Sequence, residues 1–385
     1  MRYLVLGSGL MGRAAAFDLL RHDDTKELIL ADIDESNLKS VADFLNDSRV
    51  KTVVLDAKDK AQVCEVMKGI NSVMACISYT LNFDLTKAAI KSGANFCDLG
   101  GNNTVVAKQF TLSKDAEKAN VTVIPDCGFA PGVASIFVEN GASKLDTVEE
   151  IHIRVGGLPQ DPKPPLNYSL IFAVQGLTNE YIEIVEVIRD GKLTKVEPLT
   201  EIEEIEFPEP FGKLEAFQTS GGTSTLPKTF LGKVNELDYK TIRYKGHCDK
   251  MKAILDLGFK SYDKIDFQGC KISPREFLET MLVKNLTHEN TKDLSLMRIE
   301  VIGFKDKKKM KISYQIIDYY DEENNLTSMM RMTSYPAAII ARMMAIGDVK
   351  KKGVVTQEYN VPSDLMLEEL RKRNVNIEYK EEEIN

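Results

Sequence analysis

Gly7-Ser8-Gly9-Leu10-Met11-Gly12 is a G-x-G-x-x-G pattern that directly follows the apolar stretch Tyr3–Leu6 and directly opens an amphipathic stretch, Met11–Arg21. A strand before the glycines and a helix after them are the context in which this pattern binds a dinucleotide. The first glycine permits a tight turn, the second lets the backbone approach a pyrophosphate, and the third lets helix and strand pack closely. The sequence therefore predicts a Rossmann unit in which Gly7, Gly9, Leu10, Met11 and Gly12 bind the cofactor at the helix N-terminus.

One carboxylate, Asp32, ends the second apolar stretch, 20 positions after Gly12. At this place in a Rossmann fold a carboxylate accepts hydrogen bonds from the hydroxyls of the adenosine ribose. A ribose 2′-phosphate would instead need a cation, and no Lys or Arg lies between Asp32 and Lys39. We therefore predict NAD as the cofactor, in preference to NADP.

Up to Pro125 short apolar runs alternate with stretches of helical period. Such alternation implies right-handed crossovers and an α/β fold with a doubly wound parallel sheet. The expected strands are Tyr3–Leu6, Leu28–Ala31, Thr52–Leu55, Ser72–Ile77, Asn95–Leu99 and Thr122–Ile124, and the expected helices are Met11–Arg21, Glu35–Leu45, Lys60–Met67, Asp84–Lys91 and Val105–Ala119.

From Thr147 onward apolar and polar residues alternate over longer stretches, which is typical of antiparallel strands. We expect a NAD-binding Rossmann domain over residues 1–126 and an α+β substrate and dimerisation domain with a mainly antiparallel sheet over 127–334. A C-terminal segment, 335–385, is expected to return to the Rossmann domain. The expected elements are strands at Thr147–Val155, Tyr181–Ile188, Leu237–Tyr244, Leu296–Phe304 and Lys309–Tyr319, helices at Met251–Leu257, Pro274–Lys284, Ala337–Ile346 (opened by Pro336) and Ser363–Arg373, and a frayed end at Lys380–Glu383.

The composition of the chain argues against several classes of protein. With 50 Lys and Arg against 58 Asp and Glu the net charge is −8, so the chain has no overall basic field for nucleic acid. It contains no run of about 18 apolar residues, the length that spans a membrane. The six cysteines form no C-x-x-C pair and do not cluster with the four histidines, so no metal site is expected. We expect a soluble cytoplasmic protein with reduced thiols and no nucleic-acid or membrane partner.

The loops that follow the later strands are rich in Gly, Pro and polar residues, at the sheet edge where cofactors bind. Ser78 and Tyr79 follow the fourth strand and are expected near the nicotinamide ribose. Asp98 and Gly100 follow the fifth strand at the same edge. Asp56, after the third strand, either lies beside the adenine or caps the next helix.

These motifs also identify a resemblance. The Rossmann start, together with Asp98-Leu99-Gly100-Gly101 and Asp126-Cys127-Gly128-Phe129-Ala130-Pro131-Gly132, resembles the saccharopine dehydrogenase/reductase superfamily, and within it the lysine 6-dehydrogenases. The similarity continues through residues 219–229, 237–247 and 335–338, and so covers most of the chain. The family pattern has proline where this chain has Lys245, which puts the rigidity of that loop in question.

The resemblance implies NAD-dependent oxidative deamination of L-lysine at its ε-carbon. The products would be 2-aminoadipate 6-semialdehyde and ammonia. It also implies a homodimer formed through the second domain.

Position suggests four residues for this chemistry, and three of them, His247, Arg243 and Asp126, have a plainer alternative. His247 is a general acid/base or a helix cap, and Arg243 clamps a substrate carboxylate or is a surface strand residue. Lys228 is a base or a carboxylate partner after a Gly-Gly-Thr-Ser-Thr turn. Asp126 orients the amine or caps a turn, and Cys127 beside it is a buried neutral thiol.

Two other activities fit the same pattern: a saccharopine dehydrogenase or reductase, and a carboxyspermidine-type dehydrogenase. A third hypothesis, from a different class, is an NAD-binding regulator without catalysis. The polar, Gly-rich loops at Thr219–Thr225 and Tyr244–His247 argue against it, because an NAD sensor would not need a second set of such loops.

Overall fold

The computed structural model describes residues 1–288 and 291–384. The chain folds into two compact units: unit 1 comprises residues 1–140 and 330–375, and unit 2 comprises residues 141–329 and those from 376 onward. Within the described residues no helix is long and apolar enough to cross a membrane.

Unit 1 is built on a seven-stranded sheet in which all pairs are parallel, in the order β17-β6-β5-β4-β1-β2-β3. The order reverses between β1 and β4, which is the switch point at which doubly wound sheets bind ligands. This confirms the predicted α/β fold. The strands are β1 (Arg2–Leu6), β2 (Glu27–Asp32), β3 (Val50–Val54), β4 (Ser72–Ala75), β5 (Asn95–Asp98), β6 (Thr122–Ile124) and β17 (Gly353–Val354).

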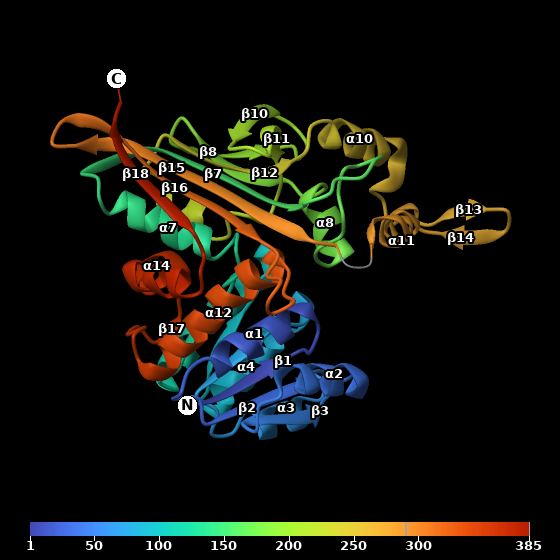
Figure 1. Ribbon diagram of the computed structural model, residues 1–385, viewed down its shortest axis with the longest axis vertical. Coiled ribbons are helices and arrows are strands. Elements are labelled where there is room, and N and C mark those ends of the chain that lie inside the picture. The colour runs from blue at the N-terminus through green and yellow to red at the C-terminus, as the bar shows by residue number, and fades with distance from the viewer. Residues whose placement is uncertain (289–290, 385) are drawn as a thin grey trace. The chain divides into compact units, whose positions relative to one another are not determined.

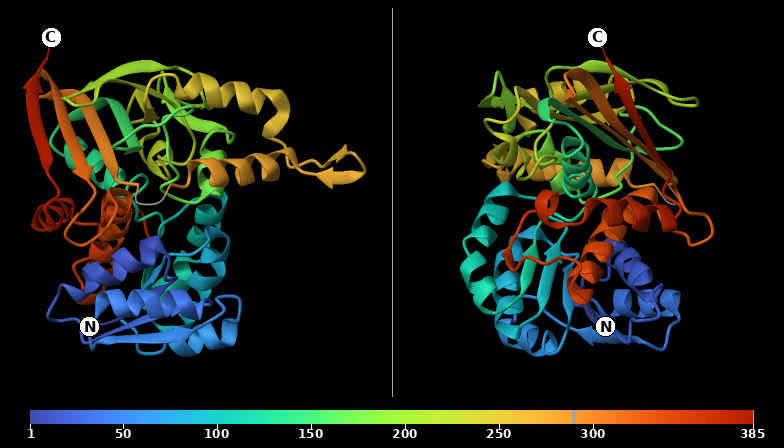
Figure 2. Two further views of the ribbon diagram at one scale, coloured as in Figure 1. Left: turned by 45° about the vertical axis from the view of Figure 1, so that its right-hand side comes forward. Right: turned by 90° about the vertical axis from the view of Figure 1, so that its left-hand side faces the viewer.

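Helices cover both faces of this sheet (Figure 2). Three of them start at a side-chain cap that accepts N–H bonds of the first turn, namely Asp34, Asp59 and Asn102. The helices are α1 (Leu10–Leu20), α2 (Glu35–Leu45), α3 (Lys60–Val66), the 3₁₀ turn η1 (Tyr79–Leu81), α4 (Asn82–Ser92), α5 (Asn103–Phe110), α6 (Ser113–Lys118), α7 (Val133–Ala142), α12 (Ser328–Ile346), α13 (Gln357–Asn360) and α14 (Ser363–Lys372).

For α5 with α6, and for α12, the predicted helix bounds were wrong. The helix expected over 105–119 is two helices, because the Thr111 and Leu112 N–H groups bond three residues back and end α5. The helix expected to open at Pro336 begins instead at Ser328, and Pro336 lies inside α12. The Asp293 carboxylate accepts the N–H groups of Ser328 and Met329 at 2.6 and 2.9 Å and so starts the helix earlier.

The returning C-terminal helices are fixed to unit 1 by buried charge. Arg373, at the end of α14, donates Nε and Nη2 to the two carboxylate oxygens of Asp18 in α1, at 2.6 and 2.8 Å. Its Nη1 reaches Glu369 at 2.6 Å. A bidentate Arg–carboxylate pair of this kind fixes orientation as well as position.

Unit 2 contains a nine-stranded sheet, ordered β10-β11-β12-β7-β15-β16-β18 with β8 and β9 attached beside β12. The β7–β12 pair is parallel and the other pairs are antiparallel, so the sheet is mainly antiparallel. Its strands are β7 (Thr147–Pro159), β8 (Val185–Arg189), β9 (Lys192–Val196), β10 (Glu203–Phe207), β11 (Gly212–Gln218), β12 (Glu236–Arg243), β15 (Asp293–Lys305), β16 (Lys308–Tyr319) and β18 (Ile377–Glu383).

The helices of unit 2 connect these strands, and a short hairpin extends from them. They are α8 (Val174–Glu180), α9 (Leu226–Phe230), α10 (His247–Ile254), a π-helical turn (Leu255–Phe259) and α11 (Pro274–Leu286), with the hairpin β13 (Ile265–Phe267) and β14 (Cys270–Ile272). Figure 1 shows the hairpin projecting beyond α11, and Ile265 and Phe267 are exposed on it.

In unit 2 the bounds of several helices and strands, and one domain boundary, differ from the prediction. The strand expected over 181–188 starts only at Val185, because Tyr181 ends α8. The helix expected over 251–257 starts at His247. The terminal residues expected to fray form β18, in which Tyr379 pairs with Tyr314 of β16. Residues from 376 onward therefore belong to unit 2, whereas residues 330–375 return to the Rossmann unit.

Candidate functional site

The glycine pattern forms the connection between β1 and α1. Gly7 has φ +100°, and a Cβ on it would lie 2.6 Å from the Cys76 carbonyl oxygen. Gly12 admits no side chain, because its Cβ would lie 1.8 Å from the Gly7 carbonyl oxygen. A Cβ on Gly9, by contrast, would meet no atom within 4 Å. The backbone is thus closely packed at Gly7 and Gly12 and open at Gly9, as the approach of a pyrophosphate requires.

Helix α1 begins at Leu10, whose side chain is exposed, followed by the partly exposed Met11. Its N-cap is Gly9, so no side chain bonds the N–H groups of the first turn. These groups carry the positive end of the helix dipole. Leu10 and Met11 therefore lie where backbone N–H groups can bind an anion.

Asp32 lies at the end of β2, next to the glycine loop. Its Oδ2 accepts the Ser8 N–H at 2.5 Å and the Ser8 hydroxyl at 2.8 Å, and its Oδ1 accepts the Asp34 N–H at 2.9 Å. The side chain remains partly exposed. These bonds hold the carboxylate beside the loop, where a ribose hydroxyl can still donate to its oxygens.

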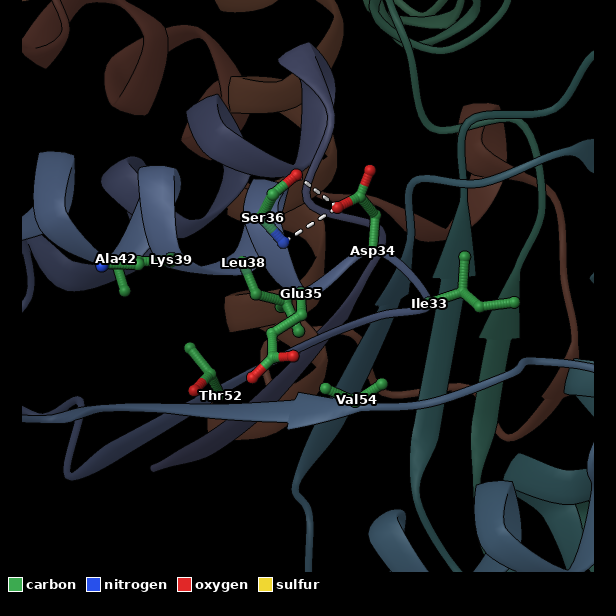
Figure 3. A pocket seen from close by; sticks show the side chains of 9 residues that line it. All are labelled: Ile33, Asp34, Glu35, Ser36, Leu38, Lys39, Ala42, Thr52 and Val54. Atoms are coloured by element: carbon green, nitrogen blue, oxygen red, sulfur yellow. Dashed lines mark hydrogen bonds between the residues drawn. The ribbon is translucent and has the colours of Figure 1, made fainter.

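A groove of about 1070 Å³ opens just beyond Asp32, between α2 and the outer strand β3 (Figure 3). Its sides are apolar at Ile33 and Val54 and charged at Asp34, Glu35 and Lys39. None of the predicted site residues lines it. Its Ile33–Asp34 end lies next to Asp32 in the chain.

The predicted residues after β3 and β4 are accessible. Asp56 is exposed and its carboxylate accepts the Lys58 N–H at 2.9 Å, which closes a turn, while the N-cap of α3 is Asp59. Ser78 is exposed and its hydroxyl lies 3.0 Å from that of Thr80. Tyr79 is partly exposed, and its ring packs on Gly101, where a Cβ would lie 2.9 Å from Tyr79 Cδ1.

Asp98, at the end of β5, is buried and already bonded to the chain. Its Oδ1 accepts the N–H groups of Gly100 and Asp126 at 2.8 and 3.2 Å, and its Oδ2 accepts the Gln109 side-chain amide at 2.7 Å. Burial raises the pKa of Asp98, while these hydrogen bonds lower it. Asp98 therefore holds the loops after β5 and β6 together and does not present a free carboxylate.

Asp126 follows β6 in a left-handed conformation, with φ +59°. A Cβ on Gly100 would lie 1.8 Å from Asp126 Oδ1, so only glycine fits against this carboxylate. Gln357 of α13 donates its side-chain amide to the carbonyl oxygens of Pro125 and Asp126, at 2.9 and 2.6 Å. Asp98, Gly100 and Asp126 thus meet at one edge of the sheet, and Gln357, which the sequence analysis missed, anchors them.

Cys127, next to Asp126, is completely buried. Its thiol lies 3.2 Å from the Ile124 carbonyl oxygen, and burial raises the pKa of Cys127 well above its usual value. A buried thiol in this state is not a nucleophile.

In unit 2 the end of β12 and the start of α10 bring Arg243 and His247 together through Tyr181. Arg243 Nε donates to the Tyr181 hydroxyl oxygen at 3.0 Å, and that hydroxyl lies 3.0 Å from His247 Nε2. His247 Nδ1 lies 2.9 Å from the Leu166 carbonyl oxygen. A carbonyl can only accept, so Nδ1 carries the proton and Nε2 accepts from Tyr181.

His247 is only 1% exposed, and burial together with the Arg243 charge lowers its pKa to about 3. The rings of Tyr168, Tyr181 and Phe217 lie around its imidazole. His247 therefore stays neutral at physiological pH and orients the Tyr181 hydroxyl. It is also the first residue of α10, but it does not cap that helix: the N-cap is Gly246, and both ring nitrogens of His247 bond other segments.

Arg243 is not a surface residue: it is 2% exposed. Its Nη1 donates to the Ile242 carbonyl oxygen at 2.9 Å, and its guanidinium lies 4.8 Å from the centre of the Tyr168 ring. No carboxylate lies within 4.0 Å of it among residues 1–288 and 291–384, and its Nη2 has no hydrogen bond to them. A buried, unpaired guanidinium is costly unless an anion binds to it.

The turn between β12 and α10 is held by one carboxylate. Glu215 of β11 accepts the N–H groups of Gly246 and Cys248 at 2.8 and 2.7 Å. Gly246 has φ +82°, which glycine adopts at little cost. This capping fixes Arg243 and His247 relative to each other, with Lys245 in the turn between them.

Lys228 is exposed on α9, and no hydrogen bond or ion pair joins its ammonium to the part of the chain that the structure describes. The structure therefore does not bring it into the Arg243–Tyr181–His247 cluster. Nor do the described residues contain a group of His, Cys, Asp or Glu side chains arranged to hold a metal ion.

The sequence analysis missed Tyr168, Glu180 and Tyr181, which complete the cluster. Glu180 is the last residue of α8, and Tyr181, which follows it, was the first residue of a predicted strand. They belong to no short motif. The Gly-rich loop touches them through its backbone, since the Ser220 N–H donates to the Glu180 carbonyl oxygen at 3.0 Å, and a contact of this kind has no sequence signal.

Two family models together match nearly the whole chain. The "Saccharopine dehydrogenase NADP binding domain" matches residues 3–124, and the "Saccharopine dehydrogenase C-terminal domain" matches residues 128–375.

Two curated relatives are similar in sequence. The chain is 22% identical to saccharopine dehydrogenase [NADP(+), L-glutamate-forming] of Saccharomyces cerevisiae over 72% of its own length and 63% of the yeast protein's. It is 20% identical to carboxyaminopropylagmatine dehydrogenase of Synechocystis sp. over 95% of its own length and 94% of that protein's.

Two solved structures share the fold. Apo saccharopine dehydrogenase (L-Glu forming) from Saccharomyces cerevisiae superposes with a TM-score of 0.81 at 19% identity, covering 99% of both chains. Homospermidine synthase from Legionella pneumophila, in complex with NAD, superposes with a TM-score of 0.68 at 13% identity, covering 98% of this chain and 91% of that one.

Proposed function

Because the chain belongs to the saccharopine dehydrogenase family, we propose that it is an NAD-dependent dehydrogenase that removes the ε-amino group of L-lysine. With water, the products are 2-aminoadipate 6-semialdehyde and ammonia. The N-terminal family model is named for binding a pyridine nucleotide, which supports a dehydrogenase reaction. The choice of lysine as the substrate rests on the site in unit 2.

The residues of the glycine loop fit a dinucleotide. Gly9 leaves open space at the uncapped N-terminus of α1, where a pyrophosphate can accept backbone N–H bonds. Bound NAD supplies an acceptor for the hydride of the carbon that bears the amine.

Two observations support NAD in preference to NADP, although the matching family model is named for NADP. Asp32 is held against Ser8 at the ribose position. Asp34 and Glu35 follow at the mouth of the adjacent groove, so a ribose 2′-phosphate would meet three carboxylates. We therefore retain NAD.

The observation that carries the proposed substrate class is Arg243, a buried guanidinium without a carboxylate within 4.0 Å among the described residues. A substrate carboxylate would supply the missing negative charge, with Nη2 free to donate to it. Arg243 is also the one Lys or Arg in the described cluster with Tyr181 and His247. One cation matches one carboxylate, which favours lysine over saccharopine with its three.

The substrate amine must lose a proton before its carbon can give up a hydride, since an ammonium has a pKa near ~10.4 in water. A site that excludes water favours the neutral amine. We propose that Asp126 orients this amine. Tyr181 donates its only hydroxyl proton to His247 Nε2 and accepts from Arg243 Nε, so we propose that it positions Arg243 for the substrate carboxylate. Lys228 remains a candidate for the base that removes the proton, but a weak one, because it is exposed on α9 outside the cluster.

A second candidate substrate is a carboxylated polyamine. The match to carboxyaminopropylagmatine dehydrogenase over 95% of the chain favours it, and such a substrate also offers Arg243 one carboxylate.

The test is to incubate the protein with NAD or NADP and with L-lysine, saccharopine or carboxyspermidine, and to measure the reduced cofactor. We expect NADH with L-lysine only. Reduced cofactor with another amine would replace lysine by that substrate. Tight NAD binding without reduction by any amine would support the non-catalytic regulator instead.

We further propose that unit 2 forms a homodimer interface, as the resemblance implied. The exposed apolar residues of the β13–β14 hairpin, Ile265 and Phe267, support this. Light scattering of the wild type and of Phe267→Ser measures it, and a monomeric wild type would contradict it.

A further inference from the structure

Next to Arg243, unit 2 contains a second charged group that the proposed chemistry leaves unused. Glu180 is the last residue of α8, directly before Tyr181. No hydrogen bond or ion pair joins its carboxylate to residues 1–288 or 291–384, and the side chain is partly exposed. The Ser220 N–H donates to its carbonyl oxygen at 3.0 Å, so the Gly-rich loop after β11 is attached at this point.

The surroundings of Glu180 are buried and short of polar partners. The Tyr168 hydroxyl is buried without a hydrogen-bond partner in the described residues, and Tyr168 as a whole is 1% exposed. The Glu180 charge acts on Tyr168, Tyr239 and Arg243. Tyr181, the residue after Glu180, accepts the Arg243 Nε–H at 3.0 Å, while Arg243 lies more than 4.0 Å from any carboxylate among the described residues. The two opposite charges are therefore linked through Tyr181 and do not form an ion pair.

The Arg243 guanidinium is buried and therefore needs an anion from outside the chain, because buried polar groups are nearly always hydrogen-bonded. The Glu180 carboxylate is partly exposed and forms no ion pair with the described residues, so a cationic group of a ligand can reach it. The buried phenol of Tyr168 can bond either group. An α-amino acid carries an ammonium and a carboxylate on the same carbon and would satisfy both charged groups. A diamine would leave Arg243 unpaired, and a dicarboxylate would leave Glu180 unpaired.

We propose that Glu180 binds the α-ammonium and Arg243 the α-carboxylate of an amino-acid headgroup, so that Glu180 selects α-amino acids. This inference rests on the proposed function, because it names the part of the substrate that remains unreacted. Glu180 is a specificity-determining residue and takes no part in the oxidation.

The proposal has a consequence for pH. Burial raises the pKa of Glu180 to about 7, against the opposite effect of Arg243. An ammonium beside the carboxylate favours the ionised form, so binding releases a proton when Glu180 is protonated in the free protein. Affinity for the headgroup should therefore rise by about tenfold between pH 6 and pH 8, since the ionised fraction of such a group rises by that factor.

The experiment measures binding by calorimetry in the presence of NAD. L-norleucine has the headgroup without the ε-amine and 6-aminohexanoate has the carboxylate without the α-amine. The wild type should bind L-norleucine and bind 6-aminohexanoate at least tenfold more weakly than L-lysine. Glu180→Gln should lose about tenfold or more in L-norleucine affinity and lose its pH dependence, because a hydrogen bond to a charged group is removed. Its 6-aminohexanoate affinity should not change.

Glu183→Gln is the matched control, since Glu183 is an exposed carboxylate three residues further along. It should bind all three compounds like the wild type. Failure of the wild type to bind L-norleucine, equal binding of 6-aminohexanoate and L-lysine, or wild-type behaviour of Glu180→Gln would overturn the inference. Headgroup-dependent binding without NADH from L-lysine would support the inference and refute only the proposed reaction.

Discussion

The glycine loop of unit 1 and the Arg243 cluster of unit 2 are two ways to build a binding site. The loop spans six consecutive residues, 7–12, and presents the uncapped backbone N–H groups at the start of α1, and its function follows from where side chains are missing. The cluster presents side chains from β12, α8, α10 and the segment around Tyr168, joined by hydrogen bonds. The difference teaches that backbone recognition is local in sequence, whereas charge recognition inside a protein is assembled from distant segments.

We expect the largest effect on stability and NAD binding from a substitution that disrupts the glycine loop. Gly12→Ala places a Cβ 1.8 Å from the Gly7 carbonyl oxygen, and this overpacking should destabilise unit 1 by about 3 kcal/mol and abolish NAD binding. Gly9→Ala is the control, because its Cβ meets no atom within 4 Å and should weaken NAD binding at unchanged stability. Denaturant unfolding and NADH fluorescence measure the two properties. Equal unfolding of both variants would contradict the division of roles.

We expect the next largest effect, on kcat/KM, from a substitution that removes Arg243 from the cluster. Arg243→Met should lower kcat/KM for L-lysine by about 100-fold through the lost carboxylate contact, while NADH binding is retained. Lys228→Met should change kcat/KM by less than about threefold, because Lys228 is exposed outside the cluster. Steady-state kinetics measure both. A larger loss in Lys228→Met than in Arg243→Met would reverse our assignment of these two residues.

A smaller effect sharpens the account of the loop. Asp32→Ala removes the carboxylate beside Ser8 and should reduce the preference for NAD over NADP by about tenfold, because one charge-assisted hydrogen bond to the ribose is lost. Competitive binding of NADH and NADPH gives the ratio. An unchanged ratio would show that Asp32 only holds Ser8.

The smallest effect concerns a second charged group of unit 2, which is paired within the chain. His152 Nδ1 lies 2.8 Å from Asp238 and Nε2 lies 3.1 Å from Glu150, with Arg154 nearby and Glu300 opposite on β15. Burial and Arg154 lower the pKa of His152, but Asp238 and Glu150 outweigh them and raise it. The stabilisation is therefore fully present below pH 6.5 and is lost as pH rises through the folded-state pKa.

The free energy of unfolding should accordingly fall by about 1 kcal/mol or less from pH 6 to pH 9. His152→Asn should remove this part of the pH dependence. Urea unfolding at several pH values measures it, and an identical profile for both proteins would contradict the assignment.

Sequence patterns predicted the elements of unit 1 because each was coded locally. The glycine spacing, the carboxylate after the second strand and the alternation of strands with helices led to the observed parallel sheet. Asp98 shows the limit of that approach: its place at the sheet edge was predicted, but its two oxygens are used by Gly100, Asp126 and Gln109. The position of a residue along a strand does not reveal how many hydrogen-bond donors surround its side chain in the folded protein.

Unit 2 was predicted less well because its pairings are distant in sequence. The last strand, β18, pairs with residues more than 60 positions away, and no local signal distinguishes it from a frayed end. α12 starts eight residues before Pro336 because Asp293, 35 positions earlier, caps it.

The amino-acid sequence alone thus determined a Rossmann-type dinucleotide-binding unit, since a turn, a helix N-terminus and a hydrophobic period are properties of neighbouring residues. Its motifs resembled the saccharopine dehydrogenase family, to which the matching family models assign the chain. Only the tertiary structure decided that His247 is neutral, that Arg243 is buried without a carboxylate within 4.0 Å in the described chain, and that Glu180 lies near it. Burial and electrostatic surroundings depend on segments that the fold brings together, so no local pattern could reveal them.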